Sequence, residues 1–425
     1  MRNSRGTAPD TTQDRWADTI RRIPPDGTRV PYAVFTDPAV YAREQERIFR
    51  GATWSFLALE AEIPKPGDYK STFIGDTPVV AVRAEDGTLH AWVNRCAHRG
   101  AQLCRYSRGN AQDFVCVYHQ WSYDLKGNLL GVPFRRGYKS MRGMPDDFNV
   151  ADHGLQRLRV ESYRGIVFAT FSPDVASLHD YLGADMRPWL DRVFKSNVVY
   201  LGCLRQYSRS NWKLYYENVK DGYHATLLHL FHNTFNIGRV NMKIRTVVDR
   251  QHGLHSLLQA ARVPDSDDAQ AYRDNKVTTF KEHVRLNDPE VIRMREEFDE
   301  PVTNHIQSIF PSLVVQQIHN TLACRQLLPK GPGEFELVFH LFGYEDDDEE
   351  LRNMRVLQAN LVGPAGYISM EDTEATELVQ RAVASDPAQF STLLMGQNDE
   401  GLGSSIITEE YIRRLWLGYK RLMEA

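Results

Sequence analysis

The chain has 425 residues, which is too long for one ordinary compact domain, so we expect two domains of unequal size. Hydrophobic residues make up 42% and charged residues 25%, near the average for a globular protein, and the net charge of −4 argues against nucleic-acid binding. Five scattered cysteines do not suggest a disulfide framework. The chain shows no apolar leader and no apolar run that could cross a membrane, so we expect a soluble cytoplasmic protein.

The first residues are polar and contain several prolines and glycines. We therefore predict a flexible arm over residues 1–28. Asp37 and Pro38 then precede AVYAREQERIF, which is the arrangement of a capping residue and an early proline before an amphipathic helix. We place this helix in a segment, residues 29–52, that packs on the larger domain.

From residue 53 to residue 170 the chain consists of short β-rich runs such as FIGDTPVVAVRA and FVCVYHQWSYDL. Turn pairs such as Asp86-Gly87 and Lys126-Gly127 separate these runs, as in a small antiparallel domain. The pattern becomes helical near residue 178 and afterwards mixes strands with helices. We therefore predict a small β domain over residues 53–170 and a larger α+β domain over residues 171–425.

Two segments of the β-rich region each offer one cysteine and one histidine, Cys96-Ala-His98 and Cys116-Val-Tyr-His119. A Rieske [2Fe–2S] centre needs two thiolates on one iron and two imidazoles on the other, and its neutral imidazoles raise its reduction potential. The alternative is a Cys2His2 zinc site, but zinc sites usually pair Cys with Cys and His with His. The interleaved order therefore favours a Rieske cluster.

A second set of metal-binding residue types lies in NWKLYYENVKDGYHATLLHLFH, residues 211–232, which has helical character. Glu217, Asp221 and His224 recur at i, i+4 and i+7, so a continuous helix would place them on one face. Crowding of ionisable groups among apolar and aromatic residues favours a metal site over ordinary packing or surface positions.

His229 lies about 140° round an ideal helix from His224. Both imidazoles can reach one metal only if the helix ends or distorts near residues 225–227. Two imidazoles and one carboxylate, with open positions for oxygen and substrate, form the facial triad of non-haem Fe(II) oxygenases. His232 is a rival ligand that spacing alone does not exclude.

The carboxylate of such a triad must come from another part of the chain. After GPAG, residues 363–366, the segment YISMEDTEATELVQR carries the adjacent acids Glu371 and Asp372. We place them between an extended apolar piece and a helix, where a ligand could project inward. The alternative is that they cap the helix that follows.

These motifs together resemble the α (large) subunits of the Rieske non-haem iron aromatic ring-hydroxylating oxygenases, whose pattern is C-x-H, C-x2-H, D-x2-H-x4-H and a late Asp. The resemblance extends from about residue 29 to near the C-terminus. It implies an α+β fold, with a small antiparallel β Rieske domain and a larger catalytic domain whose antiparallel sheet is flanked by helices (helix-grip, START-like). It implies cluster ligands Cys96, His98, Cys116 and His119, and ligands His224, His229 and Asp372 for a mononuclear Fe(II).

The resemblance also assigns a catalytic role to Asp221. By resemblance, the α subunits form a trimeric ring, in which Asp221 would link a cluster histidine of one subunit to an iron-ligand histidine of the next. The alternative for Asp221 is a structural ion pair. The family implies a hetero-oligomer with a small β subunit (α3β3, or α3 without it). Electrons would come from NAD(P)H through a separate reductase, with or without a ferredoxin, because this chain shows no Gly-rich dinucleotide fingerprint.

Segments such as NWKLYYENVKD and QANLVGPAGYISMED are most similar to salicylate 5-hydroxylase and to anthranilate, ortho-halobenzoate and terephthalate dioxygenases. We therefore expect an enzyme of aromatic catabolism that uses O2 to mono- or dihydroxylate the ring of a benzoate-type acid, with an ortho-substituted benzoate favoured over a terephthalate-type dicarboxylate. A non-catalytic zinc- or redox-binding protein is the rival from a different class.

A benzoate carboxylate cannot enter an apolar pocket without a cation or donors to meet it. Arg325 lies in the strand-like run LVVQQIHNTLACRQLLP among mostly uncharged residues, and an arginine fork suits a carboxylate. We predict that Arg325 binds the substrate, together with Asn218 and Val219. A structural salt bridge is the alternative for Arg325.

Overall fold

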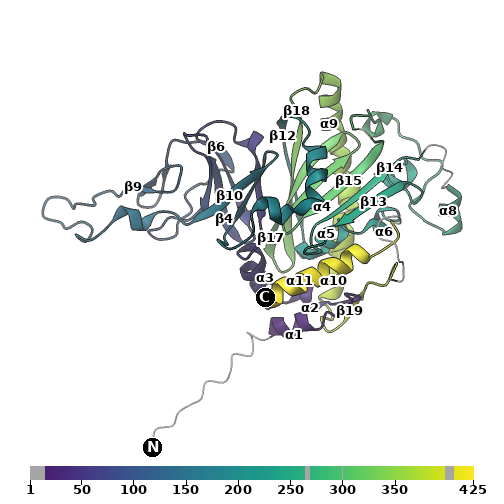
Figure 1. Ribbon diagram of the computed structural model, residues 1–425, viewed down its shortest axis with the longest axis horizontal. Coiled ribbons are helices and arrows are strands. Elements are labelled where there is room, and N and C mark those ends of the chain that lie inside the picture. The colour runs from purple at the N-terminus through teal and green to yellow at the C-terminus, as the bar shows by residue number, and fades with distance from the viewer. Residues whose placement is uncertain (1–14, 264–268, 299, 398–405) are drawn as a thin grey trace, which may run out of the picture.

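The computed structural model describes residues 15–263, 269–298, 300–397 and 406–425. Two seven-stranded antiparallel sheets form two halves that lie side by side in Figure 1. In the part of the chain that the structure describes, no helix combines the length and the apolarity needed to span a membrane. The predicted α+β class, with antiparallel sheets and flanking helices, is confirmed.

The first sheet has the strand order β2-β11-β10-β5-β4-β3-β6. Its strands are β2 (Ser55–Leu59), β3 (Asp68–Ile74), β4 (Thr77–Arg83), β5 (Leu89–Val93), β6 (Arg108–Asn110), β10 (Arg157–Tyr163) and β11 (Ile166–Thr170). A three-stranded extension holds β7 (Phe114–Val115), β8 (Ser122–Tyr123) and β9 (Leu129–Gly131). The predicted turns are present, because Gly87 and Gly127 take φ values of 80° and 82° that favour glycine.

The second sheet has the order β12-β18-β17-β16-β15-β14-β13. Its strands are β12 (Val198–Ser208), β13 (Lys243–Val248), β14 (Ser256–Ala261), β15 (Val302–Ile309), β16 (Leu313–Ile318), β17 (Thr321–Gly331) and β18 (Glu334–Tyr344). The strand-like run around Arg325 forms β16 and β17, which pair so that Val314 lies opposite Arg325. Because side chains alternate along β17, Cys324 and Arg325 face opposite sides of the sheet.

The two faces of the second sheet carry different helices. Cys324 belongs to the core that packs under α4 (Leu178–Val193), and this core also includes residues of β2 and β11, so it joins the two halves. On the other face Ala323 packs against Ala359 of α9 (Glu349–Val362), and Ile318 packs against Ile368 of α10 (Tyr367–Val383). Helix α11 (Glu410–Glu424) runs past the end of this layer (Figure 1).

The N-terminal segments pack on the same end of the molecule. They comprise α1 (Arg15–Arg21), β1 (Arg29–Pro31), α2 (Ala33–Thr36) and α3 (Pro38–Glu44), with β1 paired to β19 (Phe390–Thr392). Asp37 caps α3 and Pro38 begins it, as predicted. Residues 1–14 of the predicted arm lie outside the described residues. The rest of the arm is not loose, because α1 contacts α3 and α11 and buries Ile20.

Candidate active site

The two Cys/His segments form loops with the same backbone conformation. In each loop the cysteine carbonyl accepts a hydrogen bond from the amide four residues later, at 2.9 Å for Cys96 and 2.8 Å for Cys116. The residues that donate, Gly100 and Gln120, both take a positive φ, 74° and 57°. Two matching loops therefore present one cysteine and one histidine each, which is what a two-iron cluster requires.

The side chains of this quartet fit a Rieske cluster. Cys96 and Cys116 are buried, whereas His98 and His119 are half-buried with ring centroids 4.5 Å apart. The buried Nδ1 of His98 has no hydrogen-bond partner, as expected of an atom that faces a cluster. Trp121 stacks on the His98 ring at 4.7 Å. The thiolate iron would lie inside the domain and the imidazole iron near its surface.

Residues 211–232 fold as three short helices and not as one. These helices are α5 (Trp212–Asn218), α6 (Gly222–Ala225) and α7 (Leu230–Thr234). A break near residues 225–227, the condition under which His224 and His229 could share a metal, is present, because α6 ends at Ala225. The predicted common face of Glu217, Asp221 and His224 is wrong, because the chain also leaves the helix before Asp221, whose carboxylate caps α6.

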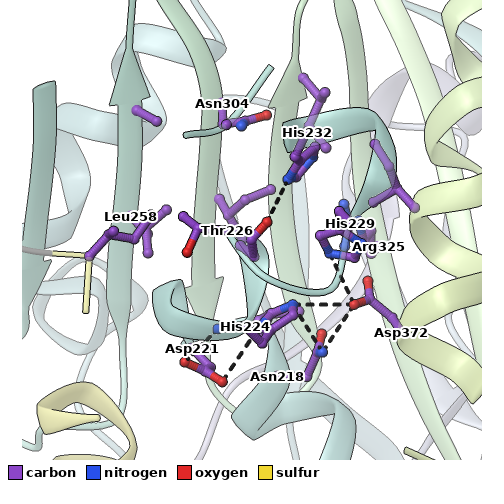
Figure 2. A pocket seen from close by; sticks show the side chains of 18 residues that line it. Asn218, Asp221, His224, Thr226, His229, His232, Leu258, Asn304, Arg325 and Asp372 are labelled. Carbon is purple, nitrogen blue, oxygen red and sulfur yellow. Dashed lines mark hydrogen bonds and ion pairs between the residues drawn. The ribbon is translucent and has the colours of Figure 1, made fainter. Parts of the chain in front are cut away.

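His224, His229 and Asp372 come together at the break between α6 and α7 (Figure 2). The Nε2 atoms of both histidines lie 3.3 Å from Oδ1 of Asp372. Among the described residues, these are the only three His, Cys, Asp or Glu side chains whose ligand atoms all lie within 4.8 Å of one another. Two imidazoles and one carboxylate that converge from one side have the composition of the facial triad that holds Fe(II).

The two late carboxylates have different partners. Both lie in the second turn of α10, which begins after Gly366, so neither caps the helix and neither lies ahead of it as expected. Asp372 points to the metal side, whereas Glu371 approaches His229 Nδ1 at 2.8 Å. A carboxylate in this position fixes the tautomer of a histidine so that Nε2 is free to bind metal.

The electrostatics of the triad suit a cation. Burial disfavours a charged His224, but Asp221 and Asp372 outweigh it and raise its pKa to about 10. Burial also opposes ionisation of Asp372, yet His229 and His224 hold its pKa well below the usual value. His232, which is buried beside these groups, has a pKa well below 6.5 because burial dominates. A divalent cation would take the place of the protons on the two ligand imidazoles.

Asp221 and Asn218 support the triad from two sides. Asp221 Oδ2 lies 3.5 Å from Nδ1 of His224, on the ring edge opposite the metal side, and its side chain remains 20% exposed. Asn218 donates from Nδ2 to Asp372 Oδ1 at 3.0 Å. Asp221 therefore connects a ligand histidine to the surface, and Asn218 orients the carboxylate.

A cavity opens beside the triad and is lined mainly by apolar side chains of the second sheet and α10, among them Leu258, Ala260, Ile306, Ile318 and Ile368. Arg325, Asn218 and Val219, the three predicted substrate contacts, all line this cavity. Arg325 is 5% exposed and donates to Tyr215 Oη at 2.9 Å and to the side chain of Gln316. No acidic side chain of the described residues lies within ion-pair distance of Arg325, so the predicted alternative of a structural salt bridge lacks a partner there.

Two neighbours of these sites were not singled out from the sequence. The Tyr123 hydroxyl lies 3.3 Å from Cys96 Sγ and accepts from the Ala97 amide. Asn304 of β15 lines the cavity. Neither residue gave a signal in the sequence: an aromatic residue in a strand is indistinguishable from core, and Asn304 is one of five polar residues in the run VTNHIQSI.

Comparisons with known proteins agree with this geometry. A family model described as the Rieske [2Fe-2S] domain matches residues 53–142, and one described as the ring hydroxylating alpha subunit (catalytic domain) matches residues 199–404. The anthranilate 1,2-dioxygenase large subunit of Burkholderia cepacia is 63% identical over 94% of this chain and 94% of its own length. Subunit alpha 2 of the terminal oxygenase component of terephthalate 1,2-dioxygenase from Comamonas sp is 44% identical over 93% of this chain and 95% of its own.

Among solved structures, naphthalene 1,2-dioxygenase from Rhodococcus sp. bound to indole has the same fold, with a TM-score of 0.78, 24% identity, and coverage of 97% of this chain and 98% of that one. The two relatives are oxygenase subunits that match this chain over almost their whole length. The alternative interpretation as a non-catalytic zinc- or redox-binding protein is therefore wrong. The chain therefore belongs to the Rieske non-haem iron aromatic ring-hydroxylating oxygenases, oxidoreductases whose α subunits carry a Rieske [2Fe–2S] cluster and a mononuclear iron.

Proposed function

We propose that this chain is the terminal oxygenase subunit that hydroxylates the ring of a benzoate-type aromatic acid with an ortho substituent. The observation that carries the proposal is Arg325, a buried guanidinium with no acidic partner among the described residues, in the wall of the cavity beside the iron triad. Its planar fork suits a ring carboxylate, which could not enter the apolar cavity unpaired. Both relatives are named for ring carboxylic acids, anthranilate and terephthalate.

A monocarboxylate fits the cavity better than a terephthalate-type dicarboxylate. Arg325 is the only arginine or lysine among the described residues that line the cavity. A second carboxylate on the far side of the ring would meet no cation, and an unpaired buried charge costs several kcal/mol or more. The greater identity to the anthranilate enzyme points in the same direction.

We assign the iron to His224, His229 and Asp372, and the cluster to the two Cys/His loops. When bound, the Fe(II) supplies the position at which O2 is activated beside the ring, and the cluster supplies electrons one at a time. The chain's own residues do the rest. Arg325 fixes the carboxylate, Asn218 orients the ligand Asp372, and Val219 with the apolar wall excludes water from the ring.

Asp221 is proposed as the link to the electron donor. Its carboxylate lies 3.5 Å from Nδ1 of His224 and is 20% exposed, so it can hold the tautomer of this ring and meet a partner at the surface. We propose that a cluster histidine of a neighbouring subunit meets it in an α3 ring, which a small β subunit completes as α3β3. A separate reductase, with or without a ferredoxin, would deliver electrons from NAD(P)H. None of the five cysteines forms a disulfide, which suits the cytoplasm.

The test is the substitution Arg325→Leu. It should raise the KM for the acid at least about 30-fold, because truncating one partner of a buried charge pair costs about 2 kcal/mol or more. The neutral amide of the same acid should lose much less, and both metal centres should stay loaded. Arg192→Leu, which removes a half-buried arginine outside the cavity, serves as control. Equal losses for acid and amide would show that Arg325 does not bind the carboxylate.

A further inference from the structure

Among the described residues that line the cavity, three buried side-chain atoms have no hydrogen-bond partner: Nδ1 of His224, Nε2 of His232 and Oδ1 of Asn304. Nδ1 of His224 still has the Asp221 carboxylate 3.5 Å away, which leaves the atoms of His232 and Asn304 as the pair to be explained. Their side chains are only 5% and 6% exposed. Buried polar atoms are nearly always paired, so an orphaned pair that lines a cavity points to a ligand that completes it. Figure 2 shows both side chains at the cavity, on the same side of the triad.

The hydrogen bond that His232 makes through Nδ1 decides whether its unpaired Nε2 is a donor or an acceptor. Nδ1 of His232 lies 3.3 Å from the carbonyl oxygen of Ala225. A carbonyl only accepts, so Nδ1 carries the hydrogen. No described acidic side chain forms an ion pair with His232, and an uncompensated imidazolium beside a metal cation would be costly. The ring is therefore neutral, and Nε2 presents a lone pair to the cavity.

Asn304 presents a second acceptor close by. Its Nδ2 donates to the Ile237 carbonyl at 3.0 Å, which orients the amide and leaves Oδ1 facing no donor. Asn304 Nδ2 and His232 Nδ1 lie 3.0 and 3.2 Å from the position that a Cβ on Gly238 would occupy, so the two side chains are neighbours. The His232 ring is 4.6 Å from the ring of the iron ligand His229. The cavity wall therefore carries an acceptor next to an iron ligand, on His232, and a second acceptor on the neighbouring Asn304.

We propose that His232 and Asn304 form a subsite for a hydrogen-bond donor on the ring carbon next to the carboxylate, and that the substrate is an ortho-aminobenzoate. The proposal rests on the proposed function, in which Arg325 anchors the carboxylate. A neutral aromatic amine offers two N–H groups to the two acceptors, a phenol offers one O–H, and a halogen or methyl group offers none. A site built to bind a donor rejects the analogue that lacks it, since its buried acceptors are then left unpaired.

The experiment measures equilibrium binding to the iron-loaded enzyme without oxygen, for 2-aminobenzoate and for 2-methylbenzoate, which has the same size and no donor. The enzyme should prefer the amine at least about 100-fold. Asn304→Leu and His232→Leu should each reduce this preference about tenfold while the iron content stays intact. Gly238→Ala, whose Cβ would press on both side chains, should reduce it with every polar group retained.

Thr303→Val is the matched control, because it removes a buried hydroxyl from the opposite face of the same strand and should leave the preference unchanged. If both benzoates bind within about threefold of each other and no variant alters their ratio, the subsite is wrong while the carboxylate anchor stands. If neither benzoate binds and Arg325→Leu changes nothing, the proposed function itself fails. Loss of iron in His232→Leu would make His232 a ligand and remove it from the subsite.

Discussion

The two metal sites of this chain are assembled in different ways. The cluster quartet comes from residues 96–119 of one small β domain, on two loops whose own backbone hydrogen bonds set their conformation. The iron triad joins the break between α6 and α7 to Asp372 of α10, and it exists only because α10 packs against α7. One site is local in sequence and has two half-buried ligands, and the other is non-local and has one half-buried ligand, His224.

Because the two sites are assembled differently, they should respond differently to mutation. Each loop of the cluster site depends on contacts a few residues apart, so a change in the catalytic domain should leave it intact. The iron site depends on several elements at once, so residues that never touch the metal should still matter there. Substitutions in each site therefore test whether the cluster site is independent of the catalytic domain and whether the iron site depends on its neighbours.

The largest effect is expected from single ligand substitutions. His98→Ala should remove the visible absorbance of the cluster and keep the mononuclear iron, whereas His224→Ala should do the reverse. Each should lower turnover by more than about 100-fold, beyond the usual cost of a supporting residue. Absorption spectra and iron content per chain measure both outcomes.

A His224→Ala variant that also lost the cluster would contradict the independence of the sites. A second test, with the neighbouring His232, checks which histidines bind the iron. Iron retained in His229→Ala and lost in His232→Ala would show that His232, and not His229, is the ligand.

Asp221→Asn tests the connection between the sites. It removes the charge beside His224 Nδ1 and keeps the shape and one acceptor oxygen for the α6 cap. Both metal centres should remain, and turnover should fall about 100-fold or more, because electron delivery loses its carboxylate link. Single-turnover reduction of the iron by the cluster, followed by the cluster's absorbance, measures this directly. Unchanged turnover with intact iron would leave Asp221 only its capping role.

The contrast between the sites also explains what the sequence could predict. The cluster ligands follow from short-range spacing, because each loop carries one cysteine and one histidine. The histidines of the iron site and the interruption between them could be inferred, since two imidazoles on a continuous helix could not meet. Glu371 and Asp372 were both candidates from the sequence, and only the family resemblance favoured Asp372, because no local pattern brings α10 to α7. The second break, at Asp221, was missed although Asp221-Gly222 is a turn pair like Asp86-Gly87, because the whole run NWKLYYENVKDGYH was interpreted as one helix.

Glu371 is expected to affect only the iron site. Glu371→Gln replaces the carboxylate that fixes His229 Nδ1 by a neutral group of the same shape. The affinity for Fe(II) should fall about 10- to 100-fold, as it does when the outer partner of a ligand histidine is changed. Glu374→Gln, on the same helix and exposed, should change nothing. Titration of the iron-free enzyme with Fe(II) measures the difference, and equal affinities for the two variants would exclude a supporting role for Glu371.

The smallest effect concerns the stability of the domain that encloses the iron site. Glu217 of α5 is half-buried and accepts a hydrogen bond from Trp416 Nε1 of α11, and desolvation of its carboxyl group raises its pKa to about 8. The folded protein therefore holds a proton that the unfolded chain releases near pH 4.5, so this group makes stability fall as pH rises from 4.5 towards 8.

Glu217→Gln keeps an acceptor for Trp416 and removes the ionisation. Its stability relative to the wild type should therefore increase by roughly 1 kcal/mol per pH unit between pH 5 and pH 7. Unfolding in urea, followed by circular dichroism at pH 5, 6 and 7, measures this slope. Glu374→Gln on α10 is the control for a substituted surface carboxylate, and a slope that did not differ from this control would mean that Glu217 ionises normally.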